Sequence, residues 1–64
     1  MENIKIGDKI KIIKMEQEPS YTNKIGVVLK IDDIGQLHGT WGGLALIPNV
    51  DLYEKIEDND DKHN

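Results

Sequence analysis

The part of the sequence best suited to binding chemistry is the run Gly39-Thr40-Trp41-Gly42-Gly43. Glycines leave backbone N–H groups accessible, and consecutive N–H groups can cradle a phosphate. A nearby tryptophan can stack on a nucleic-acid base. Tyr21, Lys24 and His38 complete this candidate ligand site, in which Lys24 would supply positive charge. The spacing matches neither a P-loop nor a dinucleotide fingerprint. A second interpretation therefore stays open, in which Trp41 fills the core and the glycines only turn the chain.

Catalytic and metal-binding residues are sparse. A triad would have to combine Ser20 and His38 with an aspartate, and a domain this small has little room for a dry pocket. Asp32, Asp33 and His38 could ligate a metal across a hairpin, although an aspartate in a turn ordinarily bonds its own backbone. The spacings of the common metal motifs are missing. We therefore predict no enzymatic activity, no cofactor and no metal.

Length and charge restrict the classes of partner. The chain has 64 residues and a net charge of −4, from 12 acidic residues and 8 lysines. Residues 1–56 hold 8 acids and 7 lysines, a net of −1, while residues 57–64 hold 4 acids and 1 lysine, a net of −3. Non-specific binding of duplex DNA needs a surplus of basic residues, so DNA is not an expected partner. The sequence has no cysteine, no hydrophobic leader and no long apolar run, which indicates a cytoplasmic protein without a membrane partner.

Alternating apolar residues predict strands. Lys9 to Ile12 alternates, and the alternation slips at Ile12-Ile13 as a β-bulge requires. Residues 16–23 read as a loop, 32–35 as a turn between strands 25–31 and 36–41, 44–47 as a fourth strand and 52–56 as a fifth. Residues 1–56 are thus predicted to form an all-β, small five-stranded barrel, Src-homology-3-like by analogy. Residues 57–64 are predicted to be a disordered acidic tail.

The alternation also suggests which side chains face the core. Ile25, Val27, Leu29 and Ile31 give the strongest period-two signal and are expected to form an inward face. Three other apolar residues lie off the expected inward faces: Ile13, Met15 and Val28. Their joint exposure would create an apolar patch and favour a symmetric homo-oligomer. The alternative is that the bulge turns the side chains around it into the core.

Three segments resemble a known family: Gly7-Asp8-Lys9-Ile10, then Gly26-Val27-Val28-Leu29-Lys30-Ile31-Asp32-Asp33-Ile34-Gly35-Gln36-Leu37-His38 with Trp41, and Ile47-Pro48-Asn49-Val50-Asp51. The family consists of short bacterial and phage proteins known only as a domain of unknown function. The resemblance implies a Src-homology-3-like fold and a phage or mobile-element context, but no activity. Members often have Trp-Asp-Asn-Gly where this chain has Trp41-Gly42-Gly43, and a glycine where it has Asn49.

Two functions fit these observations. The first is a non-enzymatic binding module, related to phages or mobile elements, that counters host defence by sequestering a nucleotide immune signal as a homo-oligomer. The alternative is an adaptor or inhibitor that binds a host protein through the barrel surface or the acidic tail.

Overall fold

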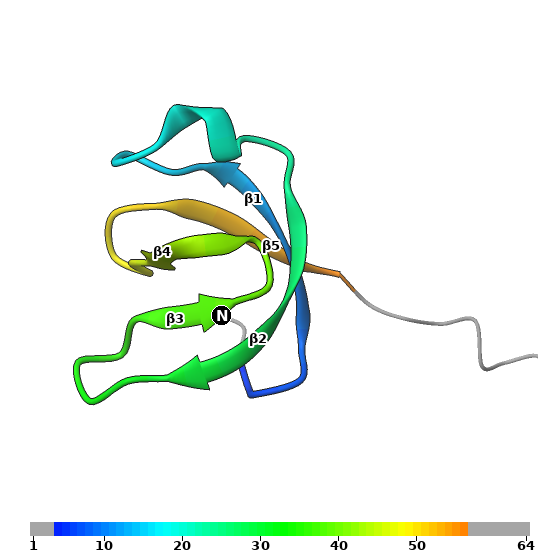
Figure 1. Cartoon of the computed structure of the whole chain (residues 1–64), viewed down its shortest axis with the longest axis vertical. Helices are drawn as coiled ribbons and strands as arrows, with labels where there is room; N and C mark the ends of the chain where they lie inside the picture. Colours follow the sequence, from blue (N-terminus) through cyan, green and yellow to red (C-terminus); the bar gives the residue numbers. More distant parts are fainter. Residues whose placement is uncertain (1–3, 57–64) are drawn as a thin grey trace, which may run out of the picture.

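The computed structural model describes residues 4–56, which form one antiparallel sheet and a short 3-10 turn (Figure 1). The strands are β1 (Lys9–Lys14), β2 (Ile25–Ile31), β3 (Leu37–Gly39), β4 (Gly42–Leu46) and β5 (Leu52–Ile56), and the turn η1 (Pro19–Tyr21) lies between β1 and β2. The predicted tail, residues 57–64, lies outside the described part of the chain. Among residues 4–56 there is no helix with the length and apolar character needed to cross a membrane.

The strand order is β4-β3-β2-β1-β5, so the last strand returns to pair with the first. This confirms the predicted all-β fold with five strands in a Src-homology-3-like order. The barrel is open, because β4 and β5 form the two edges of the sheet and do not pair with each other. The fourth strand begins at Gly42, two residues earlier than predicted, because Gly42 pairs with Gly39 across a two-residue turn.

The core contains seven buried apolar side chains: Ile10, Ile12, Met15, Val28, Leu37, Trp41 and Leu46. The predicted slip in β1 is confirmed, since its register with β5 shifts between Ile12 and Lys14. This irregularity leaves Ile13 exposed and turns Met15 into the core. The predicted patch of Ile13, Met15 and Val28 is therefore wrong, because Met15 and Val28 are fully buried.

The two faces of β2 are exchanged relative to the prediction. Ile25 and Leu29, expected inside, are 55% and 60% exposed, while the buried positions are Gly26 and Val28. The reason is the approach of the β3–β4 turn. A Cβ atom on residue 26 would lie 2.8 Å from Thr40 Oγ1 and 2.9 Å from a carbon of the Trp41 ring. A tryptophan packed this closely requires glycine on the inner face of β2, and the large aliphatic side chains then point outward.

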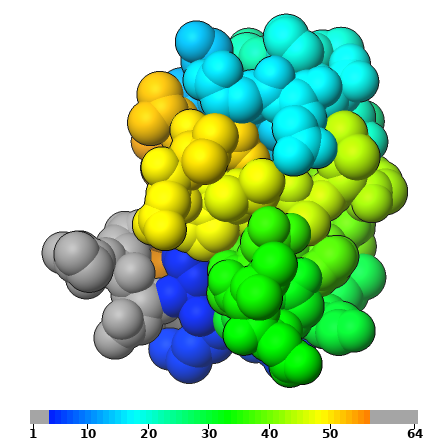
Figure 2. Space-filling view, turned by 90° about the vertical axis from the view of Figure 1, so that its left-hand side faces the viewer, coloured from blue at the N-terminus to red at the C-terminus, as the bar shows by residue number. Residues whose placement is uncertain are grey.

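A buried aspartate ties two loops together. Asp51 accepts hydrogen bonds from Glu16 N through Oδ1 and from Ile47 N through Oδ2, both at 2.9 Å. Figure 2 shows the two connected regions next to each other, the segment after β1 in cyan and the β4–β5 turn in yellow. These bonds satisfy backbone donors that would otherwise be costly to bury. Asp51 thus fixes the turn that carries the chain from one edge of the sheet to the other.

Candidate functional site

The structure brings together much of the predicted ligand site at the turn between β3 and β4. The Lys24 ammonium lies 4.9 Å from the centroid of the Tyr21 ring and donates a hydrogen bond to Trp41 O at 3.2 Å. The Tyr21 hydroxyl packs against Gly42, in space that a Cβ atom on residue 42 would need. A cation over an aromatic face is attracted by the ring quadrupole. Tyr21, Lys24 and Gly42 therefore form one contact cluster over the start of β4.

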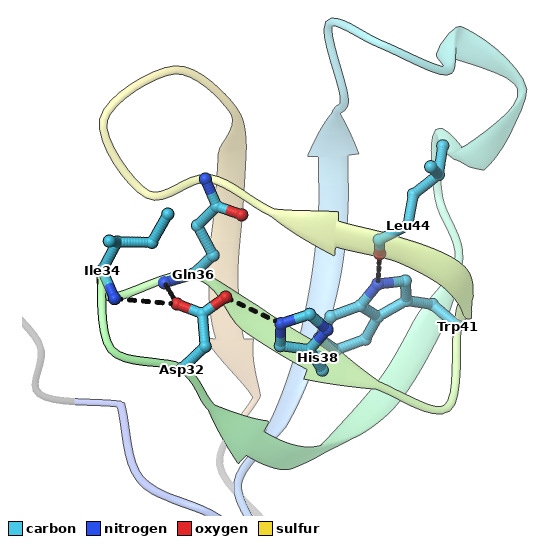
Figure 3. Close-up of polar contacts among 6 residues, drawn as sticks. All are labelled: Asp32, Ile34, Gln36, His38, Trp41 and Leu44. Atoms are coloured by element: carbon cyan, nitrogen blue, oxygen red, sulfur yellow. Dashed lines mark hydrogen bonds and ion pairs between the residues drawn. The ribbon is translucent and has the colours of Figure 1, made fainter.

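Trp41 is a core residue, so the structure supports the second of its two predicted roles, filling the core. Its side chain is 3% exposed, and its indole Nε1 donates a hydrogen bond to Leu44 O at 2.9 Å (Figure 3). The six-membered ring occupies the space where Gly39 would carry a Cβ atom. Both faces and the polar edge of the indole are thus committed within the domain. In this conformation Trp41 offers no surface on which a base could stack.

The other polar groups of the turn are used to hold the hairpin to β2. Thr40 Oγ1 accepts from Val27 N at 3.0 Å, and Thr40 N donates to Val27 O at 3.1 Å. Gly43 differs from its neighbours, because it is exposed and nothing lies within 4 Å of the position its Cβ would take. Of the predicted phosphate-binding glycines, Gly43 is the one with open space around it.

His38 is engaged by a different turn, the one between β2 and β3. Its Nε2 donates to Asp32 Oδ2 at 2.9 Å, while Asp32 Oδ1 accepts from Ile34 N and Gln36 N (Figure 3). The bond from His38, followed by the bonds from the backbone, lowers the pKa of Asp32 below its ordinary value. Both carboxylate oxygens therefore stabilise the turn. Ser20, the nucleophile considered from sequence, donates its hydroxyl to Glu18 instead.

A shallow surface hollow of about 310 Å³ lies along the same turn. It is lined by five consecutive residues: Lys30, Ile31, Asp32, Asp33 and Ile34. The lining comes from one segment only, and Figure 2 shows this hairpin, in green, projecting at the surface. Ligand sites usually converge from several elements and contain a few polar groups aimed inward. The hollow therefore lacks the convergence of elements that a small-molecule site has, although it places a lysine beside exposed isoleucines.

The sequence-based reasoning missed a surface on the outside of the sheet. We call it the outer apolar face and define it by four exposed aliphatic residues: Ile13, Ile25, Leu29 and Leu52. Three strands contribute to it, since Ile13 lies on β1, Ile25 and Leu29 on β2, and Leu52 on β5. Gly26 was the sequence signal for this surface. A glycine in an alternating strand indicates that another part of the chain approaches closely on the glycine's own face.

Lysines border this face. Antiparallel partners lie on the same side of a sheet, and the register pairs Lys11 with Ile25, Lys9 with Val27, and Lys14 with Leu52. On β5, the other neighbour of β1, Glu54 pairs with Lys11. On the outer surface, the aliphatic residues of β2 thus lie beside lysines of β1.

Comparisons with known proteins identify a family but no function. Comparison with curated proteins and with solved structures gives no match. The sequence profile of a domain of unknown function, DUF4314, matches residues 2–56, which include every described strand. The chain belongs to the DUF4314 family.

Proposed function

We propose that this protein is a non-enzymatic binding module that contacts another protein through the outer apolar face. The observation that carries the proposal is the exchange of faces in β2, which leaves Ile25 and Leu29 in solvent while a glycine occupies the inner side. Fully burying one such side chain contributes about 1.5–3 kcal/mol. Exposed apolar groups that gather on one surface commonly mark an interaction site.

The charge beside this face supports a partner with acidic and apolar side chains. Lys9 and Lys30 are exposed and form no ion pair with another of residues 4–56. Lys9 lies opposite Val27, and Lys30 follows Leu29. Two copies of this face would bring lysines towards lysines, which is unfavourable. An acidic partner would instead place carboxylates near these ammonium groups.

Affinity capture from a lysate of the source organism tests the proposal. Leu29→Glu places a negative charge on the outer apolar face, and Val50→Glu is the matched control, because Val50 is 50% exposed in the β4–β5 turn. We expect wild type and Val50→Glu to retain the same protein and Leu29→Glu to lose it, with unchanged unfolding temperatures. Equal retention by both variants would contradict the use of this face.

A second candidate is sequestration of a nucleotide signal, the form in which a small phage protein would act against host defence. The supporting observation is the cluster of Tyr21 and Lys24 beside the open backbone at Gly43. Tyr21 would replace Trp41 as the stacking surface, and the Lys24 ammonium would meet a phosphate. Calorimetric titration with cyclic dinucleotides and cyclic ADP-ribose-type compounds tests it. Heat that disappears in Lys24→Ala would support it, and the absence of heat with wild-type protein would exclude these ligands.

A further inference from the structure

Two lysines without an acidic partner lie at the end of the sheet where β5 finishes. Lys5 and Lys9 are exposed, and neither forms an ion pair with another of residues 4–56. The carboxylate of Asp8 is already engaged, since it accepts from Lys5 N at 2.8 Å and pairs with the Lys55 ammonium at 3.5 Å. Because this carboxylate joins Lys5 N to Lys55 of β5, Lys5 lies beside the end of the last strand.

The register shows how closely β5 approaches Lys9. Lys9 pairs with Ile56, the last residue of β5. Two residues further along, Lys11 pairs with Glu54. Ile10 is fully buried between the two lysines, so both lysines point to the outer side of the sheet. Since paired residues share a side, β5 supplies an acid beside Lys11 and none beside Lys9.

The residues that follow β5 in the sequence carry the opposite charge. Residues 57–61 are Glu-Asp-Asn-Asp-Asp, four acids in five positions. They come directly after Ile56, whose partner on β1 is Lys9. Adjacent strands lie about 4.8 Å apart, and five residues extend up to about 17 Å. Carboxylates of this segment can therefore reach both unpaired ammonium groups while the described strands stay as they are.

We infer that residues 57–61 fold back along the end of the sheet and compensate Lys5 and Lys9, so that the chain covers the basic border of its own outer apolar face. A single exposed ion pair contributes little, because solvent and salt screen it. Here four carboxylates are available to two ammonium groups, and the covalent connection gives them an effective concentration in about the millimolar range. The contact is therefore expected at low salt and is lost at high salt.

The contact has a consequence for binding, and this consequence rests on the proposed function. An acidic partner that uses Lys9 would first have to displace residues 57–61. The segment would thus act as an internal competitor, which lowers the affinity for weakly acidic proteins and restricts the outer apolar face to strongly acidic ones.

Paramagnetic broadening in NMR spectra of the purified full chain tests the inference without any partner. The chain has no cysteine, so Asn59→Cys provides a single position for a spin label. The control carries the same label together with Glu57→Gln, Asp58→Asn, Asp60→Asn and Asp61→Asn. At about 10 mM salt, where charges act over about 30 Å, amides of residues 5–9 should be broadened at least about twofold more with the acidic segment than in the control. At about 1 M salt, where this range is about 3 Å, the two proteins should agree.

Substitution of single lysines locates the contact. Lys9→Gln should remove most of the difference at low salt. Lys14→Gln is the matched control and should leave it unchanged, because Lys14 lies at the opposite end of β1 and has Glu16 3.6 Å away. Equal broadening with the acidic and the neutral segment would overturn the inference, as would a difference that persists at high salt or equal effects of the two lysine variants. Such a result would leave the proposed function to its own test by affinity capture, since none of these measurements involves the partner.

Discussion

The buried face of β2 carries small residues, whereas its exposed face carries large apolar ones. The inner face contributes Gly26 and Val28 to the buried layer, whereas the outer face presents the larger Ile25 and Leu29 to solvent. The inner face is small because the Trp41 ring fills the volume that side chains of β2 would otherwise occupy. Whether a position in a strand is buried therefore depends on what packs against it. The apolar character of the residues does not by itself determine which face of the strand is buried.

This comparison has a functional meaning. The inner face is fixed by stability, since its residues contact the core that holds the domain together. The outer residues Ile25 and Leu29 are exposed and do not belong to that core. Substitutions on the two faces should accordingly affect different measurements, and the following predictions test this from the largest expected effect to the smallest.

Trp41→Ala should have the largest effect on folding. It removes the largest side chain of the core and leaves Leu44 O without its indole donor. Large aromatic-to-alanine changes in cores cost about 3–5 kcal/mol, and a domain of this size has only about 3–5 kcal/mol of stability. We expect an unfolded or nearly unfolded chain by circular dichroism. A folded variant with the wild-type unfolding midpoint would show that the indole does not organise the inner face.

Gly26→Ala should destabilise the domain by overpacking. The added methyl group would lie 3.0 Å from Trp41 N, in addition to its close approach to the Trp41 ring and to Thr40 Oγ1. Overpacking a close-packed site typically costs about 1–3 kcal/mol. Urea denaturation should show a lower midpoint with the same slope. An alanine tolerated without loss of stability would mean that the β3–β4 turn can move away from β2.

Val28→Ala and Leu29→Ala form a pair of neighbours on opposite faces. Val28→Ala removes buried methyl groups and should cost about 2 kcal/mol, from roughly 0.8 kcal/mol per buried methylene plus the cavity. Leu29→Ala removes more apolar volume but should change stability by less than about 0.5 kcal/mol, as surface substitutions usually do. Chemical denaturation of both variants measures the difference. Equal losses would remove the distinction between the two faces.

Asp32→Asn should have a small effect that depends on pH. The pKa of Asp32 is lowered in the folded protein, chiefly by the bond from His38. Its stabilisation is thus present above the ordinary aspartate pKa of 3.8 and is lost as the pH falls through the lowered value. Wild type should exceed the variant in stability near neutral pH, and the two should converge in acid. Urea midpoints across this range measure the effect, and a constant difference down to the lowest pH would contradict it.

Local sequence patterns predicted the positions of the strands and turns better than they predicted which face of a strand is buried. The strands, the slip at Ile12-Ile13 and the turn at residues 32–35 depend on neighbours in the sequence, so periodicity and turn chemistry predicted them. The inward face of β2 depends on Trp41, fifteen residues after Gly26, and periodicity contains no information on that contact. The same holds for the start of β4, because a strand was predicted at residues 44–47, whereas pairing with Gly39 makes Gly42 its first residue.

For the candidate site, too, the sequence predicted which residues lie together better than the role of each residue. Grouping Tyr21 and Lys24 with Trp41 and Gly42 agreed with the structure, because the first two lie at the end of the β1–β2 connection that crosses the β3–β4 turn. The role of Trp41 remained open from the sequence, since a buried indole and a stacking platform have the same residue type. His38 was assigned to this cluster, but its bond to Asp32 depends on the hairpin register, which the sequence did not define.

The hydrogen bond from Glu16 N to Asp51 also bears on the order in which the strands pair during folding. It joins residues 35 positions apart, whereas the β2–β3 and β3–β4 connections close short loops. Since loop closure costs more entropy as the loop lengthens, we expect the hairpins to form before β5 joins β1. Pulsed hydrogen exchange during refolding should protect amides of β2 and β3 before those of β5, and simultaneous protection would contradict this. During synthesis on the ribosome, β1 would then keep an open edge until residues 52–56 have left the exit tunnel, and the nascent chain would be most prone to mispairing in that interval.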